Sequence, residues 1–335
     1  MRILKWLMGI VLVLGIIYFV GPNPSTPVYT STLPTIPSNP AELEASIHSN
    51  EKKHNTRPNN EARIVWANDS VKQKTPYAIV YLHGFSASQE EGNPVHQNIA
   101  KQFGCNLYLA RLSEHGIDTT DALINMTAET LFESAKEAYA IGKQLGENVI
   151  LMGTSTGGTL ALQLAAMYPE IAGLVLYSPN IAIKDPNAWL LNNPWGLQIA
   201  RLVKGSNYMG VTKDNPLYPQ YWNTKYRLEA TVQLEELLET TMTKENFAKV
   251  NQPLLVLYYF KNEQEQDPVV SVDAMKKMFA EVGTAAEKKR MIPVPNSGNH
   301  VMASPIQSKD IISVEKETAQ FLQSVLQLKP LNSIN

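Results

Sequence analysis

The sequence predicts an α/β fold with a mostly parallel central sheet, because short continuous apolar segments alternate with helical patterns along most of its length. Continuous apolar strands separated by helices are typical of a parallel sheet that is buried on both faces. Of the 335 residues 44% are hydrophobic and 18% are charged, a composition that supports a sizeable core. We expect strands at Arg63–Ala67, Ala78–Leu82, Leu107–Leu109, Val149–Met152, Gly173–Tyr177, Pro253–Tyr259 and Met291–Val294.

Helical patterns lie between these strands, except in the interval 181–227. The expected helices are Ala128–Leu145, Gly157–Met167, Leu228–Glu239, Val272–Val282 and Ser313–Leu326. The interval 181–227 contains several prolines, has no clean periodicity and reads as a cap insert in a folded domain of residues 61–335. We expect its aromatic residues to form an apolar pocket wall: Trp189, Trp195, Tyr208, Tyr218, Tyr221, Trp222 and Tyr226.

The first 60 residues differ in composition from the rest. Arg2 and Lys5 precede an uncharged apolar run from Leu7 to Val20, and residues 1–20 approach the ~17–25 residues that cross a bilayer. This pattern predicts a transmembrane anchor with the following domain on the non-cytoplasmic side. The alternative is a cleaved signal segment, which would leave a secreted or periplasmic protein. Residues 21–60, rich in Pro, Ser, Thr and Asn, predict a flexible or partly extended tether.

One serine lies at the apex of a predicted strand–turn–helix. Gly153-Thr154-Ser155-Thr156-Gly157 follows the apolar run Val149–Met152 and leads directly into a helical pattern. Strand and helix approach each other closely at such a turn only where the neighbouring residues lack side chains. The first N–H groups of the helix would also point toward charge that develops near Ser155. Ser155 is therefore the predicted nucleophile.

A serine nucleophile needs a base, and the chain has only six histidines. His300 lies in a Gly-containing loop behind the last predicted strand, which makes it the best candidate. His83 and His115 also lie in loops, and we expect them to anchor those loops by hydrogen bonds rather than to take part in chemistry.

The third group, an acid that orients the base, is expected after the strand Pro253–Phe260. The polar exit from this strand contains Glu263, Glu265 and Asp267. Such a cluster is usually a solvated acidic loop. Asp267 is favoured as the orienting acid, because it stands directly before Pro-Val-Val and a helical pattern, and the two glutamates are the competing candidates.

Four short motifs in a fixed order carry a resemblance to a known family. The motifs are His83-Gly84-Phe85, Gly153-Thr154-Ser155-Thr156-Gly157, Asp267-Pro268-Val269-Val270 and Gly298-Asn299-His300-Val301-Met302. Over about residues 61–330 the chain resembles an α/β-hydrolase of the serine esterase and lipase type, which includes monoacylglycerol lipases and bacterial carboxylesterases. Arg111-Leu112-Ser113-Glu114-His115-Gly116 also resembles the family's Arg-x-x-Gly-His-Gly loop, with Glu114 in place of glycine.

The resemblance implies a role for each matching residue. Ser155 would attack an acyl carbon, His300 would act as base and then acid, and Asp267 would orient His300. The oxyanion hole would consist of the backbone N–H groups of Phe85 and Thr156. The residues that support these motifs would be His83, Gly84, Gly153 and Gly157.

These expectations define a predicted function. The chain is expected to hydrolyse carboxylic esters with lipid-like or medium-chain acyl groups through an acyl-enzyme, without a cofactor. A thioesterase, amidase or peptidase that uses the same three residues is one alternative, and a catalytically silent, hydrolase-like scaffold is another. Epoxide hydrolases and haloalkane dehalogenases are disfavoured, because those relatives carry a carboxylate at the position of Ser155.

Other classes of function lack support in the composition. A formal net charge of −2 offers no basic surface for nucleic acid. The sequence has no His/Cys cluster with the spacing of metal ligands, so no metal site is expected. Cys105, the only cysteine, is expected to be a buried and inert thiol.

Overall fold

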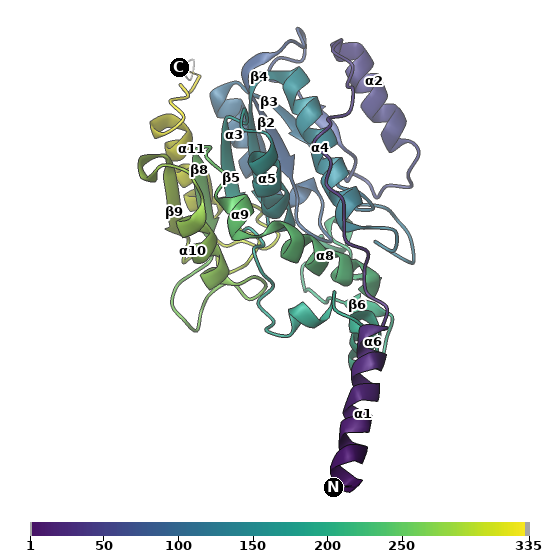
Figure 1. Cartoon of the computed structure of the whole chain (residues 1–335). Coiled ribbons are helices and arrows are strands. Elements are labelled where there is room, and N and C mark those ends of the chain that lie inside the picture. Colours follow the sequence, from purple (N-terminus) through teal and green to yellow (C-terminus); the bar gives the residue numbers. More distant parts are fainter. Residues whose placement is uncertain (1, 332–335) are drawn as a thin grey trace.

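The computed structural model describes residues 2–331, whose main body is a seven-stranded sheet with helices on both faces (Figure 1). Only the first strand pair, β1 with β3, is antiparallel, so the predicted mostly parallel sheet is confirmed, and each predicted strand is present in it. The strands in spatial order are β1 (Arg63–Val65), β3 (Asn106–Leu109), β2 (Thr75–Leu82), β4 (Gly146–Thr154), β5 (Gly173–Tyr177), β8 (Leu254–Tyr258) and β9 (Lys289–Pro293).

Each of the five predicted helices is present, with ends that differ by a few residues at most. A second, two-stranded sheet pairs β6 (Tyr208–Gly210) with β7 (Lys225–Arg227). The α-helices are α1 (Arg2–Phe19), α2 (Pro40–Glu51), α3 (Val95–Phe103), α4 (Ala128–Leu145), α5 (Thr156–Met167), α6 (Gly196–Lys204), α7 (Tyr218–Tyr221), α8 (Leu228–Thr241), α9 (Lys244–Phe247), α10 (Val272–Glu281) and α11 (Ile311–Ser324). Short 3₁₀ helices are η1 (Gln89–Gly92), η2 (Ala188–Leu190) and η3 (Ala286–Lys288).

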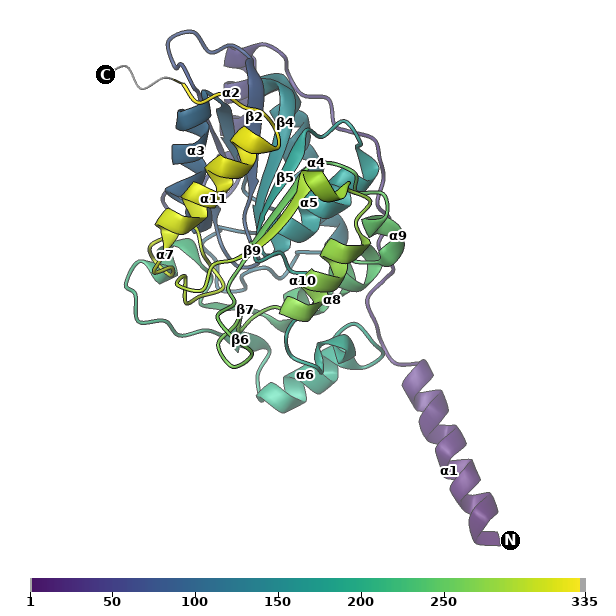
Figure 2. The same ribbon diagram turned by 90° about the vertical axis from the view of Figure 1, so that its left-hand side faces the viewer.

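The two faces of the sheet are covered by different helices, as Figure 2 shows for α3 and α11 on one side and α5 and α10 on the other. Alternate residues of each strand enter the two cores, because side chains point to opposite faces of a strand. In β2, Val80 packs with α4 and α5, whereas Ile79 packs with α3 and α11. Both residues are fully buried, which explains why the strands read as unbroken apolar runs.

Helix α1 extends away from the body of the molecule (Figures 1 and 2). Its apolar side chains are exposed, for example Trp6 at 75% and Phe19 at 81%. Within the part of the chain that the structure describes, no helix combines the length and the apolarity that a membrane crossing requires. The membrane anchor predicted for residues 1–20 is not supported by this finding. Met1 and residues 332–335, which belong to the predicted ranges 1–20 and 61–335, lie outside the described residues.

The predicted tether of residues 21–60 is extended over part of its length and packs on the main body of the molecule. The ammonium group of Lys136 on α4 is buried and donates to the carbonyl oxygens of Thr30, at 2.9 Å, and Thr32, at 3.1 Å. Tyr29 packs on Phe132 and hydrogen-bonds to Thr240 at 2.8 Å. A helix that the sequence analysis did not anticipate, α2, follows this stretch, with its first N–H groups capped by Asn39.

Helix α5 lies unusually close to the end of β2, and glycine makes this approach possible. A Cβ atom at Gly157 would lie 1.9 Å from the carbonyl oxygen of Leu82. This oxygen belongs to the backbone, so it cannot move away by a change of side-chain rotamer. The position of α5 against the sheet therefore depends on the missing side chain at Gly157.

Replacing Gly157 by alanine is expected to destabilise the protein by about 3 kcal/mol, the upper range for forcing extra volume into a packed site. Urea unfolding followed by circular dichroism measures the loss. Gly210→Ala is the matched control, because nothing lies within 4 Å of a Cβ atom there. Equal stability of the two variants would contradict this account of the close approach.

Candidate functional site

The structure places Ser155 at a strained turn between β4 and α5. Its φ angle is +53°, in a region of backbone conformation that residues other than glycine rarely adopt. The backbone of Ser155 is fixed on both sides. Its N–H donates to the carbonyl oxygen of Tyr177 and its own carbonyl accepts from the N–H of Asn180, both at 3.0 Å. The side chain of Ser155 is thereby held at the carboxyl end of the sheet, where ligands bind in open α/β folds.

His300 and Asp267 are paired by a hydrogen bond. The loop after β9 places the Nδ1 atom of His300 2.7 Å from Oδ2 of Asp267, which lies in the loop after β8. The other carboxylate oxygen of Asp267 accepts the backbone N–H groups of Val269, at 2.9 Å, and Val270, at 3.1 Å. Because the carboxylate accepts at Nδ1, Nε2 of His300 is the ring atom available for a proton from elsewhere.

The two partners have shifted pKa values with identifiable causes. Burial by itself lowers the pKa of His300, but the charge and hydrogen bond of Asp267 outweigh burial, so the pKa of His300 is raised above 6.5. Burial by itself raises the pKa of Asp267, and the charge and hydrogen bonds of its partners lower it below 3.8. Asp267 is therefore an anion at neutral pH and favours a protonated His300.

The competing acids of the same loop lie elsewhere. Glu263 and Glu265 are exposed, and Glu265 forms a salt bridge with Lys261. Asp267 is fully buried, and its backbone N–H donates to the carbonyl of Tyr259, which turns the loop back toward the sheet. Of the three carboxylates that the sequence left open, the structure brings Asp267 to His300.

Ser155 and His300 line one cavity of about 520 Å³. Phe85, which is predicted to contribute to the oxyanion hole, lines it as well. Of the seven aromatic residues predicted to form a pocket wall, Tyr218, Trp222 and Tyr226 line it, and Trp189 is half exposed to solvent. Aliphatic side chains from the 181–227 interval and its neighbours complete the apolar wall: Ile183, Leu190, Leu191, Ile199, Val203 and Met209.

The loop Gly84-Phe85-Ser86 borders this cavity through Phe85 and Ser86. The N–H of Gly84 donates to the carboxylate of Glu91, and the N–H of Ser86 donates to Nε2 of His115 at 3.0 Å. Among residues 2–331, no hydrogen-bond acceptor is present for the N–H of Phe85 or of Thr156. Thr156 is the first residue of α5, whose N–H has no partner inside the helix. Two free N–H donors are therefore available near Ser155, one in the loop after β2 and one at the start of α5.

His83 and His115 support this loop as neutral imidazoles. His83 accepts the N–H of Leu112 at Nε2, at 3.0 Å, and its Nδ1 lies 2.9 Å from the carbonyl of Gly84. Burial lowers the pKa of both histidines, that of His115 to about 4. An imidazole nitrogen accepts an N–H only when it is unprotonated, so burial and hydrogen bonding agree.

A salt bridge links the N-terminal segment to the same region. Arg111 pairs with Glu51 of α2 at 2.6 Å, and both side chains are buried. Arg111 also donates to the carbonyl of His115 at 3.3 Å. The segment before the sheet thus contributes to holding the loop that carries His115.

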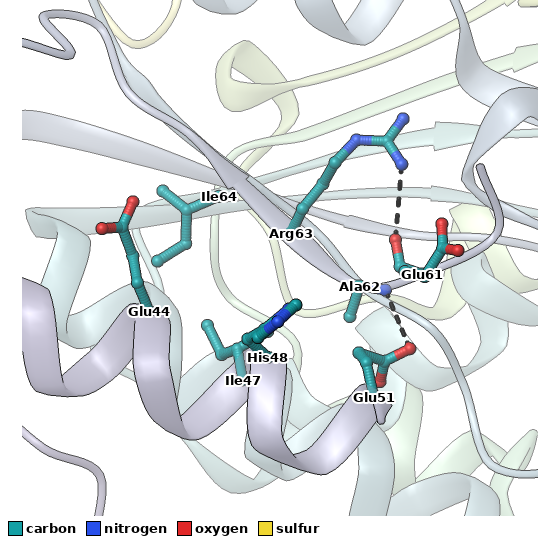
Figure 3. A pocket seen from close by; sticks show the side chains of 8 residues that line it. All are labelled: Glu44, Ile47, His48, Glu51, Glu61, Ala62, Arg63 and Ile64. Carbon is teal, nitrogen blue, oxygen red and sulfur yellow. Dashed lines mark hydrogen bonds between the residues drawn. The ribbon is translucent and has the colours of Figure 1, made fainter. Parts of the chain in front are cut away.

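A smaller cavity of about 210 Å³ lies between α2 and β1 (Figure 3). Its acidic residues are engaged: Glu51 accepts the N–H of Ala62 as well as Arg111, and Glu44 pairs with Lys72 at 2.9 Å. None of the predicted site residues lines this cavity. Within residues 2–331 no group of three or more His, Cys, Asp or Glu side chains is arranged to hold a metal ion.

Two further residues of the main cavity were not singled out by the sequence. Glu91 lies in a polar run that resembles a solvated loop, and no local signal separates it from Glu90. Asn180 lines the cavity with a buried and unpartnered Oδ1 atom. The sequence position of Asn180 could have indicated a site residue. It lies shortly after the predicted strand Gly173–Tyr177, at the edge of the sheet where ligands bind.

Comparison with known proteins places this geometry in a family. The family model described as "Hydrolase_4: Serine aminopeptidase, S33" matches residues 128–295, half of the chain. A thermostable monoacylglycerol lipase of Bacillus sp. (strain H-257) is 26% identical over 222 residues, which are 66% of this chain and 82% of that protein.

Solved structures show the same fold. One of the lipolytic enzymes in the metagenome-derived pair LipS and LipT superposes with a TM-score of 0.64, at 16% identity, over 80% of this chain and 99% of that one. The monoacylglycerol lipase of Paleococcus ferrophilus gives a TM-score of 0.56, at 16% identity, over 78% of this chain and 98% of that one. With its family model, sheet and helices in agreement, the chain belongs to the serine aminopeptidase S33 family of α/β-hydrolases.

Proposed function

We propose that this protein hydrolyses carboxylic esters with an apolar acyl group and that Ser155 is its nucleophile. The observation that carries the proposal is the Asp267–His300 hydrogen bond at Nδ1, made by a histidine that lines the same cavity as Ser155. An ester as substrate is supported by a lipase relative that matches 66% of the chain. It is also supported by the lipolytic enzymes among the structures of the same fold.

The reaction follows from the chemistry of these groups. Ser155 Oγ attacks the acyl carbon while His300 removes its proton, and the carbonyl oxygen becomes an oxyanion. His300 then protonates the leaving alcohol, and the acyl group remains bonded to Ser155. A water molecule, deprotonated by His300, releases the carboxylic acid and restores the serine. Asp267 keeps the ring in the tautomer that accepts at Nε2 and stabilises the imidazolium.

The oxyanion is assigned to the two free donors beside Ser155. The N–H groups of Phe85 and Thr156 have no acceptor within the described residues, and each belongs to a segment that contacts the turn at Ser155. A donor of this kind typically stabilises the transition state by about 3 kcal/mol. The fixed neighbours of Phe85 keep its peptide from turning away.

The substrate class rests on the cavity. Its wall is mainly aliphatic and aromatic, which favours a lipid-like or medium-chain acyl group over a charged one. A thioesterase, amidase or peptidase would use the same three residues, and the apolar wall together with the lipase relatives favours the ester. A catalytically silent scaffold is disfavoured, because Ser155 has a strained backbone and lines the same cavity as His300, which is paired with Asp267.

Localisation on the non-cytoplasmic side is a proposal that rests on the charge pattern of the N-terminus. Lys5 lies near the start of α1, whose apolar side chains are exposed, and exposed apolar surface of this extent is typical of a segment covered by lipid or by another protein.

A panel of p-nitrophenyl esters of rising acyl length tests the proposed function. We expect hydrolysis that improves from acetyl to medium-chain esters, because longer chains bury more apolar area in the cavity. Ser155→Ala should reduce kcat by at least about 10⁴-fold while the urea midpoint stays unchanged. A folded Ser155→Ala variant with full activity would falsify the assignment of the nucleophile.

The pH profile of kcat/KM tests the pairing of His300 with Asp267. The base must be neutral, so activity is lost as the pH falls through the pKa of His300, which is raised above 6.5. In Asp267→Asn burial is no longer opposed by the charge and hydrogen bond of Asp267, the larger of the effects that raise the pKa of His300, so the acid limb should move to lower pH. The rate should fall by about 10³- to 10⁴-fold. An acid limb that stays in place in Asp267→Asn contradicts the pairing.

A further inference from the structure

Glu91 is a buried carboxylate that the proposed reaction does not use. It lies in η1, is 2% exposed and lines the same cavity as Ser155 and His300. No salt bridge to Glu91 is found in the described part of the chain. A buried acid without a cationic partner is costly, so its retention beside a nucleophile calls for a role.

The hydrogen bonds of Glu91 indicate what that role is. Its Oε2 atom accepts the N–H of Gly84 at 2.5 Å. Two residues later, the N–H of Ser86 is held by His115. The two fixed amides flank the free N–H of Phe85, so the peptide planes of this loop are restrained from both ends. Glu91 holds the Gly84 end, which packs against Ser155.

The packing of Gly84 shows how close Glu91 comes to the nucleophile. A Cβ atom at Gly84 would lie 2.8 Å from Oε2 of Glu91 and 3.0 Å from Cβ of Ser155. The backbone of Gly84 is thus enclosed between the two side chains, with no room for a methyl group. Any displacement of the carboxylate would therefore be transmitted to the segment that contacts Ser155.

The protonation state of Glu91 affects the strength of this contact. Burial raises the pKa of Glu91 to about 7, while the N–H of Gly84, the charge of His300 and a hydrogen bond from Trp222 act to lower it. A carboxylate accepts a backbone N–H more strongly than a neutral group does. Because burial outweighs these effects, part of Glu91 is protonated at neutral pH, and the carboxylate that binds the N–H of Gly84 most strongly becomes dominant as the pH rises above about 7.

We propose that Glu91 is a positioning residue, which aims the N–H of Phe85 at the oxyanion by anchoring the N–H of Gly84. The inference rests on the proposed ester hydrolysis and assigns one more residue to it. Glu91 itself touches no reacting atom. Its effect appears in the transition state, because only there does the carbonyl oxygen carry the charge that the Phe85 N–H stabilises.

Replacing the carbonyl oxygen of the substrate by sulfur gives a readout specific to this role. Sulfur is a weak hydrogen-bond acceptor, so a thionoester gains little from the oxyanion hole, whereas the matching ester depends on it. The ratio of kcat/KM for the two substrates therefore reports the alignment of the donors. General destabilisation of the fold lowers both rates and leaves the ratio unchanged.

The experiment compares Glu91→Leu, which removes the acceptor, with Glu91→Gln, which keeps an amide oxygen for Gly84. Glu91→Leu should lower kcat for the ester by about 10- to 100-fold, with KM changed less than about 3-fold and the thionoester rate nearly unchanged. Glu91→Gln should keep the ester-to-thionoester ratio within about 3-fold of the parent protein. Glu90→Leu is the matched control, because Glu90 lies in the same 3₁₀ helix and bonds to Asn93 instead.

Two outcomes overturn the proposal: equal losses for both substrates in Glu91→Leu, or a ratio that falls as far in Glu91→Gln as in Glu91→Leu. Should Glu91→Leu not fold, Glu91→Asp takes its place, because its shorter side chain withdraws the oxygen from Gly84 while it keeps the charge. The same fall in the ratio is then expected. Failure of the proposed function is a separate result, in which the unaltered protein hydrolyses neither substrate.

Discussion

The close approach of α5 to the end of β2 is the constraint on which the site depends. It exists because Gly157 has no side chain to meet the carbonyl oxygen of Leu82. It brings the start of α5 against the loop that begins at His83, directly after Ser155, which has a positive φ angle. This packing brings the Ser155 turn and the unpaired N–H of Thr156 next to the loop that carries the unpaired N–H of Phe85.

The remaining groups reach this point because parallel strands share one carboxyl edge. Asp267 leaves β8 and His300 leaves β9, and these strands are neighbours in the sheet, so two loops distant in sequence meet. The loop after β2 is held independently, by Glu91 on one side and by His115 on the other. A rigid sheet edge with separately anchored loops is the arrangement that oxyanion stabilisation requires, because its donors must not reorganise during the reaction.

The sheet and its large helices were predictable because burial on both faces leaves unbroken apolar runs in the strands and 3.6-residue periods in the helices. The turn at Ser155 was predictable from its glycines. The helix α2 was not, since it carries almost no apolar face and is held by a cap at Asn39 and by the Glu51–Arg111 pair. Glu91 was not predicted as a site residue for a similar reason. Burial of its carboxylate depends on tertiary contacts to Gly84 and Trp222, which no local sequence pattern encodes. The roles of Ser155, His300 and Asp267 stay predictions that their geometry supports.

The most direct test of the central claim is the crystal structure of the protein after reaction with a p-nitrophenyl alkylphosphonate, which mimics the tetrahedral intermediate. The account predicts a bond between phosphorus and Oγ of Ser155. It also predicts a phosphoryl oxygen about 2.7–3.1 Å from the backbone nitrogens of Phe85 and Thr156. An adduct on another residue, or a phosphoryl oxygen turned away from both nitrogens, would contradict it.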